Sequence, residues 1–376
     1  MKLTDICEFH GGSQPPKSEW SSEYKDGYIR MLQIRDFTQE GRVTPEYVKI
    51  SNRLRLCTED DILIGRYGAS VGKILSGKSG AYNVAIMKAV PDTSVVRKQY
   101  LRYYFLSPNF QNYILNLGGR AAQAGFSKDD LARLEITVVS LEEQDKIVNE
   151  LSTLEKTIST KQKQLKEFDD LVKSRFIEMF GTLDLSIQGE TWLPLSDVST
   201  IFTGTTPSTK DSENWNGDIP WVTPAELSDD SFVVCDTERK ITQKGMKSKS
   251  LSLMPKNTVL LSTRAPIGKV AITGIEMCCN QGFKNFYCNN TVLNPIYLYT
   301  LLRNNSEYLN SLGTGTTFKE ISKKNASNIK VPVADISLQN EFADFVKLID
   351  KSKFIVQKQI DDLQELLDSK MDEYFG

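Results

Sequence analysis

The chain has 376 residues and a formal net charge of −2, with 46 Lys or Arg and 48 Asp or Glu residues. This length allows two domains with separate cores, and the composition is that of an ordinary globular protein. The six cysteines include no Cys-x-x-Cys pair and His10 is the only histidine, which argues against a zinc site, a disulfide framework and histidine-based catalysis.

The first 140 residues are predicted to form a strand-rich domain. Leu3-Thr-Asp-Ile6 is expected to form a short strand that leads into a Gly-x-x-Pro loop at residues 12–15. Residues 61–73 predict a hairpin, because an apolar strand, a turn and a Gly-Lys pair precede a second apolar strand. Residues 99–116 predict a helix, and Ser127 is expected to cap another, short helix. No apolar run reaches membrane-spanning length and the first residues form no signal peptide, so we expect a cytoplasmic protein.

Residues 141–181 are predicted to form one long helix. Ser140 and Glu143 form a capping box, and the stretch contains no proline or internal glycine. Apolar residues recur every seven positions, beginning with Leu151 and Ile158. A stripe this narrow is typical of a helix that packs on a partner helix.

The chain then repeats itself. At an offset of 195 residues, Gly181 falls on Gly376 and Gln144 on Gln339, so residues 336–376 predict a second long helix that pairs with the first. Residues 182–335 repeat the first domain, with a Leu-Ser-Asp-Val opening, a Gly-x-x-Pro loop at 204–207, a hairpin at 258–269 and a helix at 295–312. The predicted seam between the long helices consists of Leu151, Leu154, Ile158, Leu165, Phe168, Val172, Val346, Ile349, Val356, Ile360, Leu363 and Leu367.

This doubled order of motifs resembles the specificity (S) subunit of type I restriction-modification systems, over essentially the whole chain. The resemblance implies an α+β fold in which two tandem target-recognition domains, 1–140 and 182–335, are each followed by a long helix. The two helices would form an antiparallel coiled coil with pseudo-twofold symmetry. Each domain would read one half of a bipartite, asymmetric DNA target, while the helices set the spacer and dock modification subunits.

The resemblance also implies the partners. They are double-stranded DNA, two modification (methyltransferase) subunits and, in the full complex, restriction or motor subunits. S-adenosylmethionine, ATP and Mg are then expected on those subunits and none in this chain, which has no Gly-rich phosphate loop ending in Lys-Ser/Thr. The chain itself is expected to be a recognition subunit and not an enzyme.

Candidate DNA-binding residues lie mainly in the turns and small-residue loops of both domains. Arg can grip guanine with two hydrogen bonds, Lys and Thr can bind phosphate, and Gln can read adenine. Gln33 and Arg35 alternate with apolar residues, which predicts that they share one face of a strand. The candidates are Gln33, Arg35, Arg66, Tyr67, Ser70, Lys73, Arg120, Gln123, Lys128, Thr205, Thr206, Thr223, Arg264, Lys269, Gln281, Thr314, Thr316, Thr317, Lys319 and Lys323.

Each of these residues also has a plain structural interpretation. The charges at the hairpins can be solvated turn residues, the glycine loops can simply end helices, and Tyr67 can be a packing residue. Asn83 and Asn280 can either read bases or stabilise turns at strand ends. Two other functions stay open at this point, a stand-alone restriction enzyme or methyltransferase and a scaffold protein that binds no DNA.

Overall fold

The computed structural model describes residues 1–39, 41–118, 125–187, 189–228, 231–264, 266–315 and 319–376. The chain folds into two compact units. The first unit contains Met1–Gln162 and Lys358–Gly376, and the second contains Lys163–Gln357. At the offset of 195 residues, Gln162 falls on Gln357, so both long helices are divided at equivalent positions. Each unit therefore combines one strand-rich domain, the first part of its own helix and the last part of the other helix.

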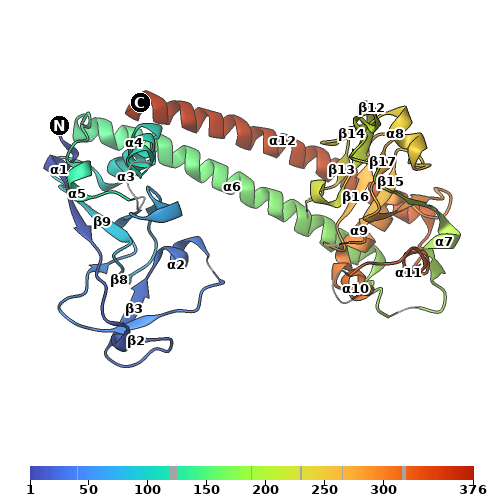
Figure 1. Cartoon of the computed structure of the whole chain (residues 1–376), viewed down its shortest axis with the longest axis horizontal. Coiled ribbons are helices and arrows are strands. Elements are labelled where there is room, and N and C mark those ends of the chain that lie inside the picture. The colour runs from blue at the N-terminus through green and yellow to red at the C-terminus, as the bar shows by residue number, and fades with distance from the viewer. Residues whose placement is uncertain (40, 119–124, 188, 229–230, 265, 316–318) are drawn as a thin grey trace. The chain divides into compact units, whose positions relative to one another are not determined.

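The first unit contains two small sheets and several short helices (Figure 1). One sheet is antiparallel, with the order β1 (Cys7–Gly11), β9 (Ile86–Pro91), β6 (Ile62–Gly65), β7 (Ile74–Leu75). The other has the order β2 (Trp20–Ser21), β4 (Tyr47–Lys49), β3 (Tyr28–Leu32), β8 (Gly80–Tyr82), β5 (Leu56–Cys57). The helices are α1 (Leu3–Ile6), α2 (Ile34–Thr38), α3 (Lys98–Leu106), α4 (Pro108–Gly118) and α5 (Lys128–Leu131), with the 3-10 turns η1 (Lys17–Glu19) and η2 (Gly68–Ser70).

The second unit repeats this arrangement with different strand lengths. Its main sheet has the order β11 (Ser199–Thr203), β18 (Phe283–Cys288), β15 (Thr258–Ser262), β16 (Val270–Thr273), β13 (Val233–Val234). Smaller sheets contain β14 (Lys240–Ile241), β12 (Trp215–Val222) and β17 (Cys278–Cys279), and β10 (Leu193–Pro194) with β19 (Lys330–Val331). The helices are α7 (Leu195–Val198), α8 (Gln243–Ser248), α9 (Pro295–Asn304), α10 (Ser306–Ser311) and α11 (Lys323–Ser327), with the 3-10 turns η3 (Ser212–Asn214) and η4 (Pro224–Glu226).

The two hairpins predicted from the sequence are confirmed, since β6 pairs with β7 and β15 with β16, both antiparallel. Ser127 caps a short helix as expected, and its equivalent Ser322 does the same, each accepting a hydrogen bond from the backbone N–H three residues later. The strands predicted at the two Leu-x-Asp openings are wrong, because α1 and α7 are helical turns whose leucines are buried. Only the following residues, in β1 and β11, are extended.

The single helices predicted over 99–116 and 295–312 are each broken in two. Ser107 has an extended ψ of 151° because a residue that precedes proline is disfavoured in the helical region, and Pro108 starts α4. The second copy has no proline here and breaks at Asn305. The Asn305 side chain donates to the Leu183 carbonyl at 3.0 Å and accepts from the Leu185 N–H at 2.9 Å, which fastens the linker between the repeats.

The long helices are α6 (Leu141–Phe180) and α12 (Ile336–Phe375), and they pack together in antiparallel fashion within each unit. In the first unit Tyr374 donates to Glu150 at 2.6 Å and Lys161 donates to Gln359 at 2.6 Å. Residue numbers thus increase along α6 in the direction in which they decrease along α12, as in an antiparallel pair. The second unit has the Arg175–Glu341 ion pair at 3.0 Å and the Lys353–Asp169 pair at 3.0 Å. All twelve predicted seam residues are buried or half-buried, which confirms the predicted helix pair.

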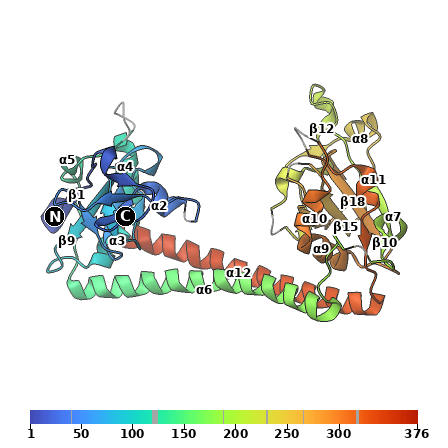
Figure 2. The same cartoon turned by 90° about the horizontal axis from the view of Figure 1, so that it is seen from below.

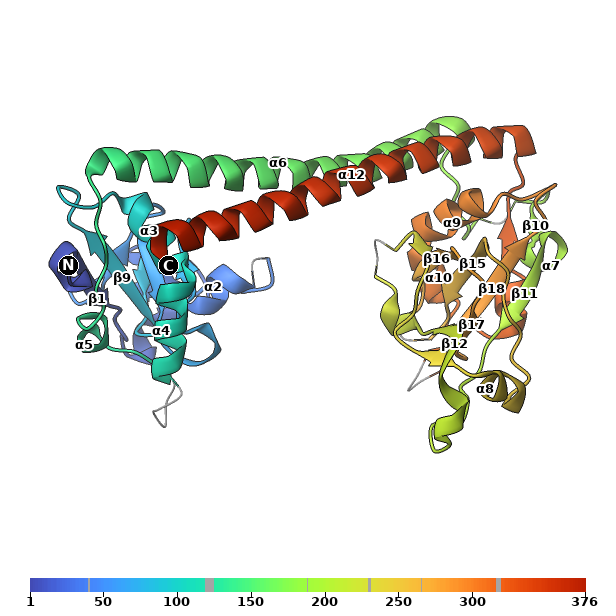
Figure 3. The same cartoon turned by 90° about the horizontal axis from the view of Figure 1, so that it is seen from above.

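The end of each long helix completes the core of the opposite repeat. Phe375 and Met371, the last apolar residues of α12, belong to the core of the first unit, where the rings of Phe375 and Tyr100 are 5.0 Å apart. Phe176 of α6 belongs to the core of the second unit and stacks on Tyr297 with a centroid separation of 5.5 Å. In both units one helix, α3 or α9, lies between a sheet and the long helices (Figures 2 and 3).

Gln144 and Gln339, which the repeat aligns, are both fully buried and fully hydrogen-bonded. Gln144 accepts from the Arg97 N–H at 2.7 Å and donates to two carbonyls of its own unit at 2.9 and 3.1 Å. Gln339 makes the same three bonds, accepting from the Asn294 N–H at 2.9 Å. Because buried polar groups are costly unless paired, these glutamines hold the start of each long helix against its domain.

Among the described residues no helix is long and apolar enough to cross a membrane.

Candidate nucleic-acid interface

The Gly-x-x-Pro loop of each domain is held against the turn that follows a strand. A Cβ on Gly12 would lie 2.0 Å from the Asn83 carbonyl oxygen, and one on Gly204 would lie 1.9 Å from the Cys279 carbonyl oxygen. Only glycine permits so close an approach of two backbones. Asn83 and Asn280 stabilise these turns, since each side chain accepts a hydrogen bond from the backbone N–H two residues later.

In the second domain this contact gathers four predicted residues. Thr206 donates to the Gln281 side chain at 2.7 Å, and Trp221 donates to the Thr205 carbonyl at 3.1 Å. Thr223 follows the same strand as Trp221 and caps η4 with Glu226. Because the Asn280 N–H bonds to the Val222 carbonyl at 3.1 Å, Gln281 also lies beside the end of β12. The cluster of Thr205, Thr206, Thr223 and Gln281 is the part of the prediction that the structure brings together most clearly.

The strand predicted for Gln33 and Arg35 is wrong. Strand β3 ends at Leu32, and Gln33 is the N-cap of α2, because the Asp36 carboxylate accepts the Gln33 N–H at 2.8 Å and turns the chain into a helix. The two side chains nevertheless meet, since both donate to the carboxylate of Glu46 on the neighbouring segment. Arg35 and Glu46 also line a shallow cavity of about 380 Å³, together with Ser22, Gln39, Arg42, Val43 and Thr44.

The hairpin turn of the first domain presents a mixed surface. The Arg66 guanidinium donates to the Phe126 carbonyl at 3.3 Å and lies 4.9 Å from the centre of the Tyr67 ring. Tyr67 is 41% exposed, so it is not a core residue. Its backbone pairs with Gly125, which brings the turn beside the segment that leads to Lys128. Lys73 and Lys128 are exposed, and Ser70 lies in η2 at the turn.

The corresponding turn of the second domain is more strongly paired. Arg264 bonds to one oxygen of the Glu320 carboxylate at 2.8 Å, and Lys284 contacts the other oxygen at 3.3 Å. Partial burial tends to raise the pKa of Glu320, but the Arg264 hydrogen bond and the Lys284 charge hold this pKa below its usual value. The ammonium of Lys269 donates to the Leu227 carbonyl, so it is turned to its own domain. Thr314 bonds to the Glu320 backbone at 3.4 Å.

The remaining predicted residues divide into two groups. Lys319 and Lys323 are exposed near this turn. Arg120, Gln123, Thr316 and Thr317 lie outside the described residues. Whether any of the candidates touches DNA stays a prediction.

Sequence reasoning missed Arg239. Its guanidinium carbon lies 3.6 Å from the ring centre of Trp215 and 5.3 Å from that of Trp221. Trp215 and Trp221 lie in β12, and the pairing of this strand with the segment before β14 brings Arg239 to them. No local pattern signals such a contact, because it depends on strand register.

The sequence model of the family described as the type I restriction modification DNA specificity domain matches residues 1–168 and 190–365, one match for each repeat. The chain belongs to this family. The resemblance found in the motifs is therefore confirmed over most of the chain.

Individual relatives agree with this family. The MjaIX specificity subunit of a type I restriction enzyme from Methanocaldococcus jannaschii is 36% identical over 185 residues, which is 48% of this chain and 43% of that protein. The likeness to this relative thus spans less than half of its length. The MjaVIII specificity subunit of the same organism is 22% identical, with 97% of this chain and 89% of that protein covered. The crystal structure of the type I S subunit from M. genitalium shares the fold, with a TM-score of 0.59 at 16% identity, covering 100% of this chain and 95% of that one.

Proposed function

We propose that the chain is the DNA-specificity subunit of a type I restriction-modification complex, in which each domain reads one half of a bipartite, asymmetric target. The observation that carries the proposal is the separate match of the specificity-domain family to each repeat. The two domains have a similar backbone arrangement but different side chains at equivalent positions. For example, Gln33 stands at the start of α2, and Thr223 stands at the equivalent start of η4. Unlike side chains on a common plan support two unlike half-sites.

A stand-alone restriction enzyme or methyltransferase is not favoured by this family match. In the proposed complex, S-adenosylmethionine, ATP and Mg belong to the partner subunits. Burial raises the pKa of the Cys57 and Cys278 thiols to about 11, so neither is suited to act as a nucleophile. The six cysteines are free thiols, which supports the expected cytoplasmic location.

The outward faces of the long helices support docking of two modification subunits. In α6 an exposed stripe follows the helical spacing through Lys163, Glu167, Asp170, Leu171, Ser174 and Glu178. At the offset of 195 residues the exposed residues of α12 are Lys358, Asp362, Glu365, Leu366, Ser369 and Glu373, with the charge pattern retained. Leu171 and Leu366 are 46% and 45% exposed. A single exposed leucine is ordinary, but the same surface presented twice fits two copies of one partner.

The outward faces of the first halves of the helices are not retained in this way. Leu348, Phe354 and Ile355 of α12 are exposed. At the offset of 195 residues, the equivalent positions of α6 hold Thr153, Ser159 and Thr160. We therefore assign the shared docking surface to residues 163–181 and 358–376. Its acidic residues and one leucine call for a partner surface with basic side chains around an apolar pocket.

Replacing both leucines of this surface should prevent assembly. Leu171→Asp or Leu366→Asp alone is expected to remove one modification subunit, and the double variant both, because each site loses about 2 kcal/mol or more of a central apolar contact. Native mass spectrometry of the purified complex measures the stoichiometry. Ile177→Asp is the matched control, since Ile177 is 41% exposed on the same helix but its equivalent is already Asp372. Equal loss with Ile177→Asp, or two subunits bound to the double variant, would contradict the assignment.

The proposed function is tested by producing the chain with its modification partner in cells that have no type I system. Mapping methylated bases across the genome is expected to show one bipartite sequence with unlike halves. The chain produced alone should leave the genome unmodified. Methyl transfer by the isolated chain, or methylation without sequence preference, would refute the proposal.

A further inference from the structure

Arg239 lies on a platform made by two tryptophans of β12. Trp215 and Trp221 pack edge to face, with ring centres 5.1 Å apart and an interplanar angle of 84°. Both are nearly buried, at 9% and 2% exposure, whereas Arg239 is exposed. A guanidinium 3.6 Å from the centre of an indole ring is attracted to the ring face and held in orientation. The platform thus restricts the plane of the Arg239 side chain.

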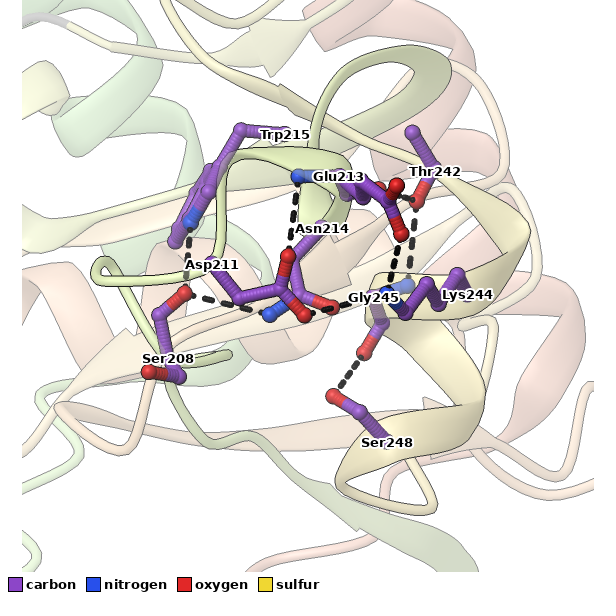
Figure 4. A network of polar contacts seen from close by, with 9 residues as sticks. All are labelled: Ser208, Asp211, Glu213, Asn214, Trp215, Thr242, Lys244, Gly245 and Ser248. Carbon is purple, nitrogen blue, oxygen red and sulfur yellow. Dashed lines mark hydrogen bonds and ion pairs between the residues drawn. The ribbon is translucent and has the colours of Figure 1, made fainter.

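The platform is fastened to the loop that carries Thr205 and Thr206. Trp221 donates to the Thr205 carbonyl at 3.1 Å, and Trp215 donates to the Ser208 carbonyl at 3.1 Å. Figure 4 shows Trp215 and Asn214 converging on Ser208, where the Asn214 amide makes a second bond of 3.1 Å. Arg239 is therefore in fixed register with the candidate interface of the second domain.

Lys240 and Lys244, which follow Arg239 in the sequence, both form ion pairs. Lys244 bonds to Glu213 and contacts Asp211 at 3.1 Å (Figure 4). The hydrogen bond to Glu213, followed by that to Asp211, raises the pKa of Lys244. Lys240 pairs with Asp236 at 3.2 Å. Within the parts of the chain that the structure describes, no carboxylate forms an ion pair with Arg239. Its N–H groups lie in the plane of the guanidinium, and stacking does not use them, so they are available to a ligand.

The first domain has the opposite charge at this place. The Glu46 carbonyl accepts the Met31 N–H at 2.8 Å, as the Arg239 carbonyl accepts the Trp221 N–H at 3.1 Å, so Glu46 and Arg239 are equivalent. The Glu46 carboxylate is occupied by Gln33 and Arg35. At equivalent positions, the first domain thus has a carboxylate with two hydrogen-bond donors, and the second has the guanidinium of Arg239. Domains that recognise unlike half-sites are expected to differ at such a position.

We propose that Arg239 reads a guanine in the half-site of the second domain. Guanine presents two acceptors, O6 and N7, in one plane at the major-groove edge, and two N–H groups of a guanidinium match them. Stacking on Trp215 orients the donors in advance, so less side-chain freedom is lost on binding. A phosphate offers a similar pair of acceptors. Its contact would carry no sequence information, and this difference decides the test. The proposal rests on the proposed function.

The experiment uses the assembled complex of the chain with its modification subunits and duplexes randomised in the target. Arg239→Gln is expected to reduce the preference for guanine at one position of the second half-site by about 5- to 150-fold, with the first half-site unchanged. Arg239→Lys, which retains the charge, should lose most of this preference because it cannot stack as a planar fork. Lys249→Gln, at the exposed lysine that follows α8, is the control and should leave every base preference unchanged.

Two results would overturn the assignment to Arg239. In the first, Arg239→Gln weakens DNA binding equally for all sequences and reduces its salt dependence, and Arg239→Lys restores the affinity. This is the behaviour of a phosphate contact. The other is unchanged preference in both halves. In either case the first half-site would still be read, so the proposed function would stand. Loss of sequence preference in the unsubstituted complex would instead refute the proposed function itself.

Discussion

Phe375→Ala, at the end of the chain, is expected to destabilise the domain at its beginning. The Phe375 ring is 6% exposed and lies 5.0 Å from the Tyr100 ring and 6.3 Å from the Tyr104 ring. Its backbone carbonyl also accepts a hydrogen bond of 3.3 Å from Asn109. Removing a buried phenylalanine leaves a cavity and costs about 3–5 kcal/mol, so the free energy of unfolding of the first unit should fall by that amount.

Hydrogen exchange resolves which unit is affected. Phe375→Ala should reduce protection in α3 and α4 and leave α9 unchanged. Phe176→Ala should do the reverse, because Phe176 is 2% exposed and packs on Tyr297 and Phe342 of the second unit. Phe354→Ala makes the same change on α12 at a side chain that is 73% exposed, and it should alter stability by less than about 0.5 kcal/mol. Equal effects of Phe375→Ala and Phe354→Ala would contradict the shared core.

The long helices and their seam were predictable from the sequence because their signal is local and periodic. Seven-residue spacing places Leu151 and Ile158 on one face whatever surrounds them, and the structure buries both. The repeat also identified Gln144 and Gln339 as equivalent. Their role could not be inferred, because it depends on backbone groups such as the Arg97 and Asn294 N–H that lie about fifty residues away in the chain.

Short elements were harder to predict, since capping interactions decide them. Gln33 and Arg35 alternate with apolar residues as in a strand, yet one hydrogen bond from the Gln33 N–H to Asp36 starts a helix.

The candidate site was predictable in part. The Gly-x-x-Pro loop and Gln281 were recognised as separate motifs, and their contact through Thr206 appears only in the fold. Arg239 had no signal, because its tryptophan platform is created by the pairing around β12.

The fragment of residues 1–181 is expected to form a symmetric dimer. In the full chain the core of the first unit is completed by Met371 and Phe375, which this fragment lacks. At the offset of 195 residues, Phe176 and Phe180 take their places, so the helix of a second fragment can fill the same position. Each apolar side chain so buried contributes about 1.5–3 kcal/mol, enough in sum for association at micromolar concentration.

The fragment dimer should be weaker than the full chain for a specific reason. Lys161 is equivalent to Val356, which is 6% exposed in the seam, so the dimer places a lysine there from both chains. The Lys161 contact with Gln359 can be retained, because Gln164 is the equivalent residue. Analytical ultracentrifugation should show a dimer for 1–181 and a monomer when Phe176 and Phe180 are both replaced by alanine. A monomeric unsubstituted fragment would show that the repeats do not exchange helix ends.

The central claim is that each repeat reads its own half of the DNA target. Methylated sites should be mapped in cells that contain the modification partner with the full chain, with the 1–181 fragment, or with a chain whose residues 192–335 come from another specificity subunit. The account predicts an asymmetric bipartite site for the full chain and its first half in inverted repeat for the fragment. The exchanged chain should change the second half alone. An exchange that alters both halves, or a fragment that directs methylation to an asymmetric site, would contradict it.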